Sequence, residues 1–205
     1  MKKIFSMNGS IFGFMTKIYQ ILVLNVFFII SSLPIVTIGA SFTALYSCCL
    51  KIANDEEVSL WIDYKRSVKN NFKIATQVFF LILAAFVIIF GLAYTAQQWH
   101  FTVGLWIMLG IVTVLIFGVE FLFPLIARFK NTLSGYLNNA VGLSFHNAAV
   151  SIAVFIVTVG LLVFFPVFIP KLFFLWLFTA FGAVGLINSY LFKYVFNKYE
   201  DSAKE

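Results

Sequence analysis

Apolar runs long enough to cross a membrane recur along this chain of 205 residues. Each run holds about twenty residues, and a helix of that length crosses about 30 Å of hydrocarbon. Hydrophobic residues make up 62% of the chain, charged residues make up 11%, and the mean hydropathy is +1.00, which excludes a soluble domain. Lipid cannot pair with backbone groups, and the alternating pattern of an outer-membrane barrel is missing. The sequence therefore predicts an all-α integral membrane protein, folded as a single bundle over residues 1–205.

The first apolar run, residues 18–50, is too long for a single crossing, because one helix of this length would measure about 50 Å. The segment SSLPIVTIGAS interrupts it near its middle. Pro34 removes an amide donor and disfavours a helical conformation in the preceding residue, and Gly39 tolerates backbone angles or close contacts that other residues do not. The break predicts a helical hairpin with spans at residues 10–33 and 40–54.

The turn of this hairpin is expected at Pro34 to Gly39, at or just beneath the outer membrane surface. Thr37 and Ser41 are placed to cap the helix that restarts after the break. Two interpretations stay open: a re-entrant element that lines a cavity, as in broken-helix transporters, and a tight hairpin packed against its neighbours. We favour the packed hairpin.

Four further spans, at residues 73–96, 102–126, 147–169 and 172–194, bring the number of transmembrane helices to six. Short cytoplasmic loops carry an excess of Lys and Arg, and this arrangement puts every basic residue except Lys171 in the cytoplasm. The cytoplasmic set is Lys2, Lys3, Lys17, Lys51, Lys65, Arg66, Lys69, Lys73, Arg128, Lys130, Lys193, Lys198 and Lys204. We therefore expect a multi-pass protein of the cell membrane with both termini in the cytoplasm.

Residues 58–72, between the second and third spans, combine aromatic and basic side chains. The apolar face predicted for this segment holds Trp61, Tyr64, Val68 and Phe72, and its basic residues are Lys65, Arg66, Lys69 and Lys73. This pattern is typical of an amphipathic helix at the cytoplasmic interface, where it would contact the lipid bilayer and attract anionic headgroups.

Polar side chains inside the predicted spans are few. Glu120 is the only carboxylate far from a loop, about 12 Å along its helix from Arg128. Asn25, Gln77 and Asn188 lie at a similar predicted depth on three other helices. These groups indicate either a solute or proton site or an interhelical hydrogen-bond cluster, and we favour the cluster because such groups pair readily in membranes.

Motifs of known catalytic chemistry are absent from the sequence. It holds no Gly-rich phosphate loop, no HExxH and no Gly-x-Ser-x-Gly, and its two histidines, His100 and His146, are expected on opposite sides of the membrane. We therefore expect a protein that is not an enzyme and has no metal or cofactor. The net charge of +6 follows from the topology and gives no support for a nucleic-acid partner.

Three segments resemble the YesL family of bacterial membrane proteins: LPIVTIGASFTALY at residues 33–46, KNNFKIAT at 69–76 and FPLIARF at 123–129. The resemblance runs from about residue 10 to residue 195. It implies a fold of five to six helices. Family members tend to be encoded beside carbohydrate ABC importers and glycan-degrading enzymes, which implies a role in saccharide uptake. Tyr64 and Val68 depart from the family, whose members are often richer in Phe in this segment.

Two functions follow as expectations. The first is a non-enzymatic accessory membrane protein associated with carbohydrate uptake or utilisation, with components of a carbohydrate ABC transporter as its partners. The alternative is an autonomous small-solute transporter or channel with an intramembrane polar site around Glu120. Small residues at Gly182, Gly185 and Ser189 suit close helix packing within the monomer and leave homo-oligomerisation as an option.

Overall fold

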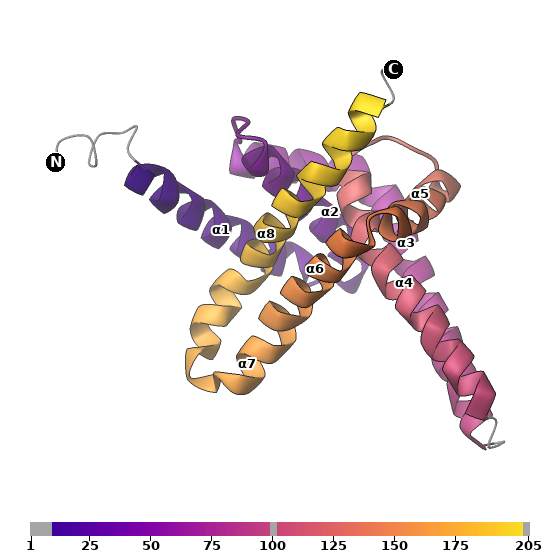
Figure 1. Ribbon diagram of the computed structural model, residues 1–205. Helices are drawn as coiled ribbons and strands as arrows, with labels where there is room; N and C mark the ends of the chain where they lie inside the picture. The colour runs from indigo at the N-terminus through magenta and orange to yellow at the C-terminus, as the bar shows by residue number, and fades with distance from the viewer. Residues whose placement is uncertain (1–9, 99–101, 203–205) are drawn as a thin grey trace.

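The structure, a computed structural model, describes residues 10–98 and 102–202, and this part of the chain is all-α (Figure 1). Two short 3-10 helices, η1 and η3, and one π-helix, η2, interrupt the α-helices. The elements are α1 (Ser10–Ser32), η1 (Ile35–Thr37), α2 (Ile38–Ala53), α3 (Leu60–Gln98), α4 (Thr102–Arg128), α5 (Leu133–His146), α6 (Ala148–Val159), η2 (Gly160–Phe164), α7 (Phe165–Phe168), η3 (Pro170–Leu172) and α8 (Phe173–Ser202).

Six helices of the described residues are long and apolar enough to cross a membrane. They cover Gly13–Ser32, Ile35–Ala53, Leu60–Gln98, Trp106–Arg128, Ala148–Phe168 and Pro170–Glu200. The prediction of an all-α, multi-pass membrane protein is thus confirmed. Three of the predicted cytoplasmic lysines, Lys2, Lys3 and Lys204, lie outside the described residues.

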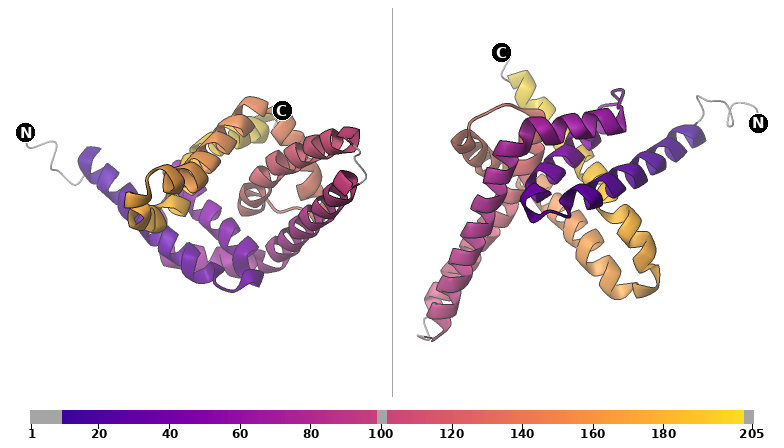
Figure 2. Two further views of the ribbon diagram at one scale, coloured as in Figure 1. Left: turned by 90° about the horizontal axis from the view of Figure 1, so that it is seen from below. Right: turned by 180° about the vertical axis from the view of Figure 1, so that it is seen from behind.

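Two predicted boundaries differ from the structure. The amphipathic segment 58–72 and the span 73–96 form one continuous helix, α3, which changes direction where its first part gives way to the part beside α4 (Figure 2, right). A hydrogen bond of 3.0 Å from the Ser59 amide to the Asp63 carboxylate stabilises the start of α3. The sequence also gave no separate helix for α5, whose first turn is capped by Thr132 through a bond of 3.2 Å from the Gly135 amide.

Helix α2 lies at the centre of the fold, since twelve of its sixteen residues are buried. Two hydrophobic clusters meet on it. One cluster joins α2 to α1, the start of α3 and α8, and the other joins it to α4, α5, α6 and α8. A helix of mainly small residues suits this central place, because small side chains let neighbouring backbones approach closely.

Glycines mark the closest helix contacts. A Cβ added at Gly39 of α2 would overlap the carbonyl oxygen of Ala75 in α3 and lie 2.9 Å from the Phe79 Cβ. A Cβ at Gly182 of α8 would overlap the carbonyl oxygen of Ile21 in α1. Gly39 lies inside a helix, so close approach, and not an unusual backbone angle, is the reason for a glycine there.

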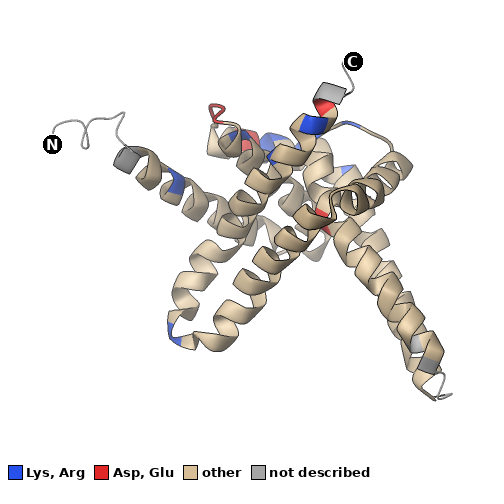
Figure 3. Ribbon diagram, in the orientation of Figure 1, with Lys and Arg blue, Asp and Glu red and all other residues tan. Residues whose placement is uncertain are grey.

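Lys and Arg gather at one end of the bundle, which we call the basic end (Figure 3). Two hydrogen bonds to α8 bring the start of α1 and the end of α2 together at this end. Lys17 donates to the Tyr190 hydroxyl at 2.7 Å, and Lys193 donates to the Ala53 carbonyl at 2.8 Å. Residues 18–50 therefore do turn back, as predicted. Lys171 lies in η3, at the opposite end, where α7 meets α8.

The turn of the first hairpin lies beside the middle of α3, with Ile35 and Val36 exposed at the protein surface. Thr76 of α3 donates a hydrogen bond of 3.1 Å to the Val36 carbonyl, and Gly39 packs on Ala75. About 33 Å of helix separates Thr76 from Gln98, the end of α3. The position of Pro34 to Gly39 relative to the outer membrane surface stays a prediction. The α1–α2 hairpin enters from the basic end and stops well short of the far end of α3 and α4 (Figure 2, right).

Hydroxyl groups satisfy the backbone at this turn. The Thr37 hydroxyl lies within hydrogen-bonding distance of the carbonyls of Ser31 and Pro34, so it caps the end of α1. Ser41 donates to the Thr37 carbonyl at 2.9 Å. Neither side chain caps the start of α2, which corrects the predicted role. The carbonyls freed by Pro34 must be paired internally, since lipid offers no donors.

Candidate functional site

Asn25 belongs to a helix contact. It is fully buried, its amide nitrogen donates to the Leu177 carbonyl at 2.8 Å, and its oxygen accepts from the Gly182 amide at 3.1 Å. Both partners are backbone atoms of α8. Asn25 therefore joins α1 to α8, and neither of these hydrogen bonds involves Glu120.

The predicted four-residue polar cluster does not form. Gln77 is exposed on α3, on the side away from the packed face that holds Ala75 and Val78. Asn188 of α8 is fully buried and donates to the Thr158 hydroxyl of α6 at 3.0 Å, while its own oxygen has no hydrogen-bond partner among the described residues. The reason is rotational: residues at similar depth need not point at the same neighbour, because each helix turns about 100° per residue.

A partly open cavity of about 300 Å³ lies beside Glu120. We call it the Glu120 cavity. Five elements line it: α2, α3, α4, the α6–η2 junction and α8. Its lining residues are Phe42, Leu45, Tyr46, Phe79, Ile82, Val119, Glu120, Phe123, Thr158, Leu162, Phe181, Val184 and Gly185. The walls are mostly apolar and aromatic, with a carboxyl and two hydroxyl groups among them.

Glu120 has one buried oxygen, Oε2, that no donor reaches among the described residues. Its cavity is lined by no Lys, Arg or His in that part of the chain. Buried carboxyl groups in membrane proteins are normally paired or solvated, because an unpartnered one is costly. The Glu120 carboxyl is thus an acceptor at the edge of a cavity, and no donor from residues 10–98 or 102–202 reaches its buried oxygen.

The π-helix η2 shapes one wall of the cavity. Leu162 from η2 and Thr158, just before it, both line the space. The indole nitrogen of Trp176 donates to the Leu161 carbonyl at 2.7 Å, which satisfies a backbone oxygen in the widened turn. Single π-turns inside α-helices are frequent at functional sites. The segment GLLVF carries no sequence signal for this turn, and the sequence likewise gave no reason to single out Tyr46 or Thr158.

The basic face of α3 is exposed as predicted, with Lys65, Arg66, Lys69 and Lys73 at the surface. Trp61 is also exposed, and the Lys65 ammonium lies 5.9 Å from its ring centre. Tyr64 is different, because it is only 5% exposed. Its hydroxyl lies 2.6 Å from the Ser31 hydroxyl of α1, so Tyr64 joins α3 to the first hairpin and is not part of a membrane-facing surface.

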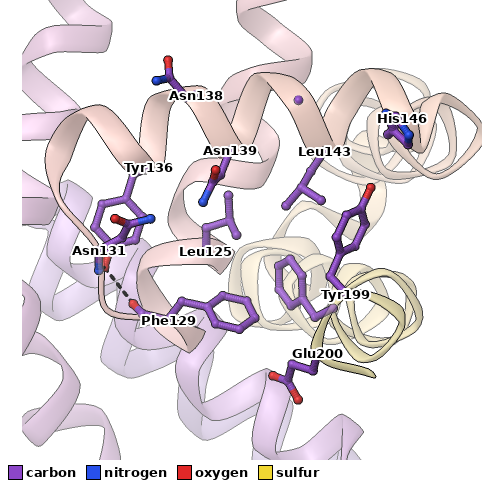
Figure 4. Close-up of a pocket in the computed structure, with 12 residues that line it drawn as sticks. Leu125, Phe129, Asn131, Tyr136, Asn138, Asn139, Leu143, His146, Tyr199 and Glu200 are labelled. Carbon is purple, nitrogen blue, oxygen red and sulfur yellow. Dashed lines mark hydrogen bonds between the residues drawn. The ribbon is translucent and has the colours of Figure 1, made fainter. Parts of the chain in front are cut away.

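A second cavity, of about 490 Å³, opens between α5 and the ends of α4 and α8 (Figure 4). Asn139 and Leu143 face it from α5, across from Tyr199. Below it the Arg128 guanidinium pairs with Glu200 through two bonds of 2.9 and 3.0 Å. This space is more polar than the Glu120 cavity and contains several amide and aromatic side chains.

No group of three or more His, Cys, Asp or Glu within residues 10–98 and 102–202 is placed to hold a metal ion. No curated protein and no solved structure matches the chain. Residues 21–92, which run from α1 through α2 into α3, match the sequence model of an uncharacterised domain family described as "Protein of unknown function, DUF624".

Proposed function

We propose that the protein is a non-enzymatic transporter or channel that binds a small solute in the Glu120 cavity and moves it across the membrane. The observation that carries the proposal is the buried, unpartnered Glu120 oxygen at a cavity formed by five elements. A purely structural role would give this carboxyl a protein donor, as Asn25 has in the α8 backbone. Leaving such a group without one costs about 1 to 3 kcal/mol, or more for a charged group.

The broken first hairpin supports this proposal. Phe42, Leu45 and Tyr46 of α2 line the cavity about one and a half to two and a half turns beyond the end of η1. Transporters commonly build their solute sites from interrupted helices near the middle of the membrane. The first hairpin stops short of the far end of α3 and α4, and its helix α2 lines the cavity together with α3, α4, α6 and α8. We further propose the cell membrane as its location, with the basic end and both termini in the cytoplasm.

Purified protein in liposomes tests the proposal. The vesicles are loaded with a pH-sensitive dye and exposed in turn to glucose, glycine and choline, with parallel uptake of the radiolabelled solutes. We expect flux of a solute or of protons that Glu120→Gln lowers by at least about tenfold while the melting temperature stays within a few degrees.

Glu57→Gln is the matched control, because it removes the same charge from an exposed loop residue. Flux through the wild type that Glu120→Gln and Glu57→Gln leave equally intact would contradict a role for the cavity. No flux of any solute or of protons would contradict transport itself.

An accessory role in carbohydrate uptake is our second proposal, together with membership of the YesL family. The resemblance of residues 33–46, 69–76 and 123–129 to that family supports both. The open cavity beside α5 supports the accessory role, because amide and aromatic side chains at an accessible end of the bundle offer contacts to a partner subunit.

Crosslinking in cells followed by purification in mild detergent tests the accessory role. We expect a carbohydrate importer subunit to copurify with the wild type, and Asn139→Lys, which changes the charge of the open cavity, to reduce its recovery. Gln77→Lys, on an exposed site elsewhere, is the control. Recovery of the protein without any importer subunit would count against this second proposal.

A further inference from the structure

Aromatic rings make up much of the wall of the Glu120 cavity. They come from three elements besides the helix of Glu120 itself, and their full set is Phe42, Tyr46, Phe79, Phe123 and Phe181. The faces of aromatic rings carry negative electrostatic potential and attract cations. The carboxyl group of Glu120, which has one buried oxygen, is a second attraction for the same kind of ligand.

We propose that the Glu120 cavity binds a small organic cation, either a protonated amine or a quaternary ammonium compound. The charged head would lie against Glu120 and the rings, and the apolar groups of the ligand against the aliphatic wall formed by Leu45, Ile82 and Val184. This proposal deepens the proposed function, because it rests on the same cavity and adds the class of solute.

The rings are held in place before any ligand binds. Phe42 stacks on Phe123 with ring centres 5.5 Å apart. The ring centre of Phe28 lies 4.7 Å from that of Phe42 and 4.7 Å from that of Phe181. This chain of contacts links α1, α2, α4 and α8. Side chains that are already ordered lose little conformational entropy when a ligand binds, so less of the binding free energy is spent on ordering them.

The same lining argues against other classes of solute. An anion would meet Glu120 with no Lys, Arg or His in the described lining to balance it. A sugar presents a hydroxyl on almost every carbon, and the cavity offers it only Tyr46, Glu120 and Thr158 as polar lining side chains. Its volume of about 300 Å³ is at the lower end for ligand pockets, which suits a compact molecule.

Choline and 3,3-dimethylbutan-1-ol are the probes that separate charge from shape, because they have nearly the same size and only choline is charged. Binding is measured at equilibrium by competition against radiolabelled choline, with the protein in lipid nanodiscs. We expect choline to bind at least about tenfold more tightly than the neutral alcohol. Glu120→Gln should remove this preference, and Phe123→Leu, which keeps an apolar wall, should weaken choline binding severalfold.

Three controls keep the result interpretable. Glu57→Gln should bind choline as the wild type does, thermal melts report whether each variant is folded, and Glu120→Asp retains the charge if Glu120→Gln fails to fold. Equal binding of choline and the alcohol, absent choline binding, or unchanged choline binding by Glu120→Gln would each overturn the proposal. If these binding tests fail but another solute shows flux that Glu120→Gln abolishes, the proposed transport function stands and only the choice of ligand is wrong. If choline binds but no solute is transported, the proposed transport function is wrong and the cation site stands.

Discussion

Gly39→Leu will leave little folded protein, because the new side chain has no room between α2 and α3. Even a Cβ would overlap the Ala75 carbonyl and lie 2.9 Å from the Phe79 Cβ. Backbone atoms cannot move aside as flexible side chains do, so the helices must separate. We expect a loss of about 3 kcal/mol or more in the free energy of unfolding. Gly39→Ala should have a smaller effect in the same direction.

Gly110→Leu is the matched control. Gly110 also lies inside an apolar helix, α4, and a Cβ added there would meet no atom within 4 Å. The two variants therefore differ in helix packing and not in helix propensity or hydrophobicity. Size-exclusion profiles and thermal melts in detergent measure the difference. Similar melting temperatures for Gly39→Leu and Gly110→Leu would show that the α2–α3 contact does not limit stability.

A cysteine at position 36 will resist a membrane-impermeant thiol reagent, because the turn of the first hairpin stops about 33 Å of helix short of the far end of α3. The reagent is added to intact cells that carry Val36→Cys in a background with Cys48→Ala and Cys49→Ala. Gln98→Cys should react in the same cells, since Gln98 is exposed at the far end of α3. Strong labelling at position 36 would instead place the turn at the outer membrane surface.

The same experiment tests the proposed orientation. Lys3→Cys and Lys65→Cys should both resist the reagent in intact cells and react after the cells are opened, since the basic end is proposed to face the cytoplasm. Each introduced cysteine is expected to be either almost fully labelled or almost unlabelled. Labelling at position 3 but not at position 65 in intact cells would mean that residues 18–50 cross the membrane once.

The residues of the candidate site illustrate the limit of sequence analysis. Glu120 could be singled out because a carboxylate within an apolar run is visible in the sequence. Its surroundings could not, since Asn25 pairs with the α8 backbone and Gln77 faces outward. The rings of Phe42, Phe123 and Phe181 come from residues far apart in the chain, so no spacing within one segment predicts the wall that they form.

The sequence by itself determined the number of long apolar helices, the reversal of the chain near Pro34 and the gathering of basic residues at one end. These features follow from hydrophobicity, backbone restriction and charge, which belong to each residue whatever its neighbours are. Only the tertiary structure decided the depth of the first hairpin, the burial of Tyr64 and the shape of the Glu120 cavity. These depend on which faces of the helices meet and in what register, and close contacts such as Gly39 on Ala75 set that register.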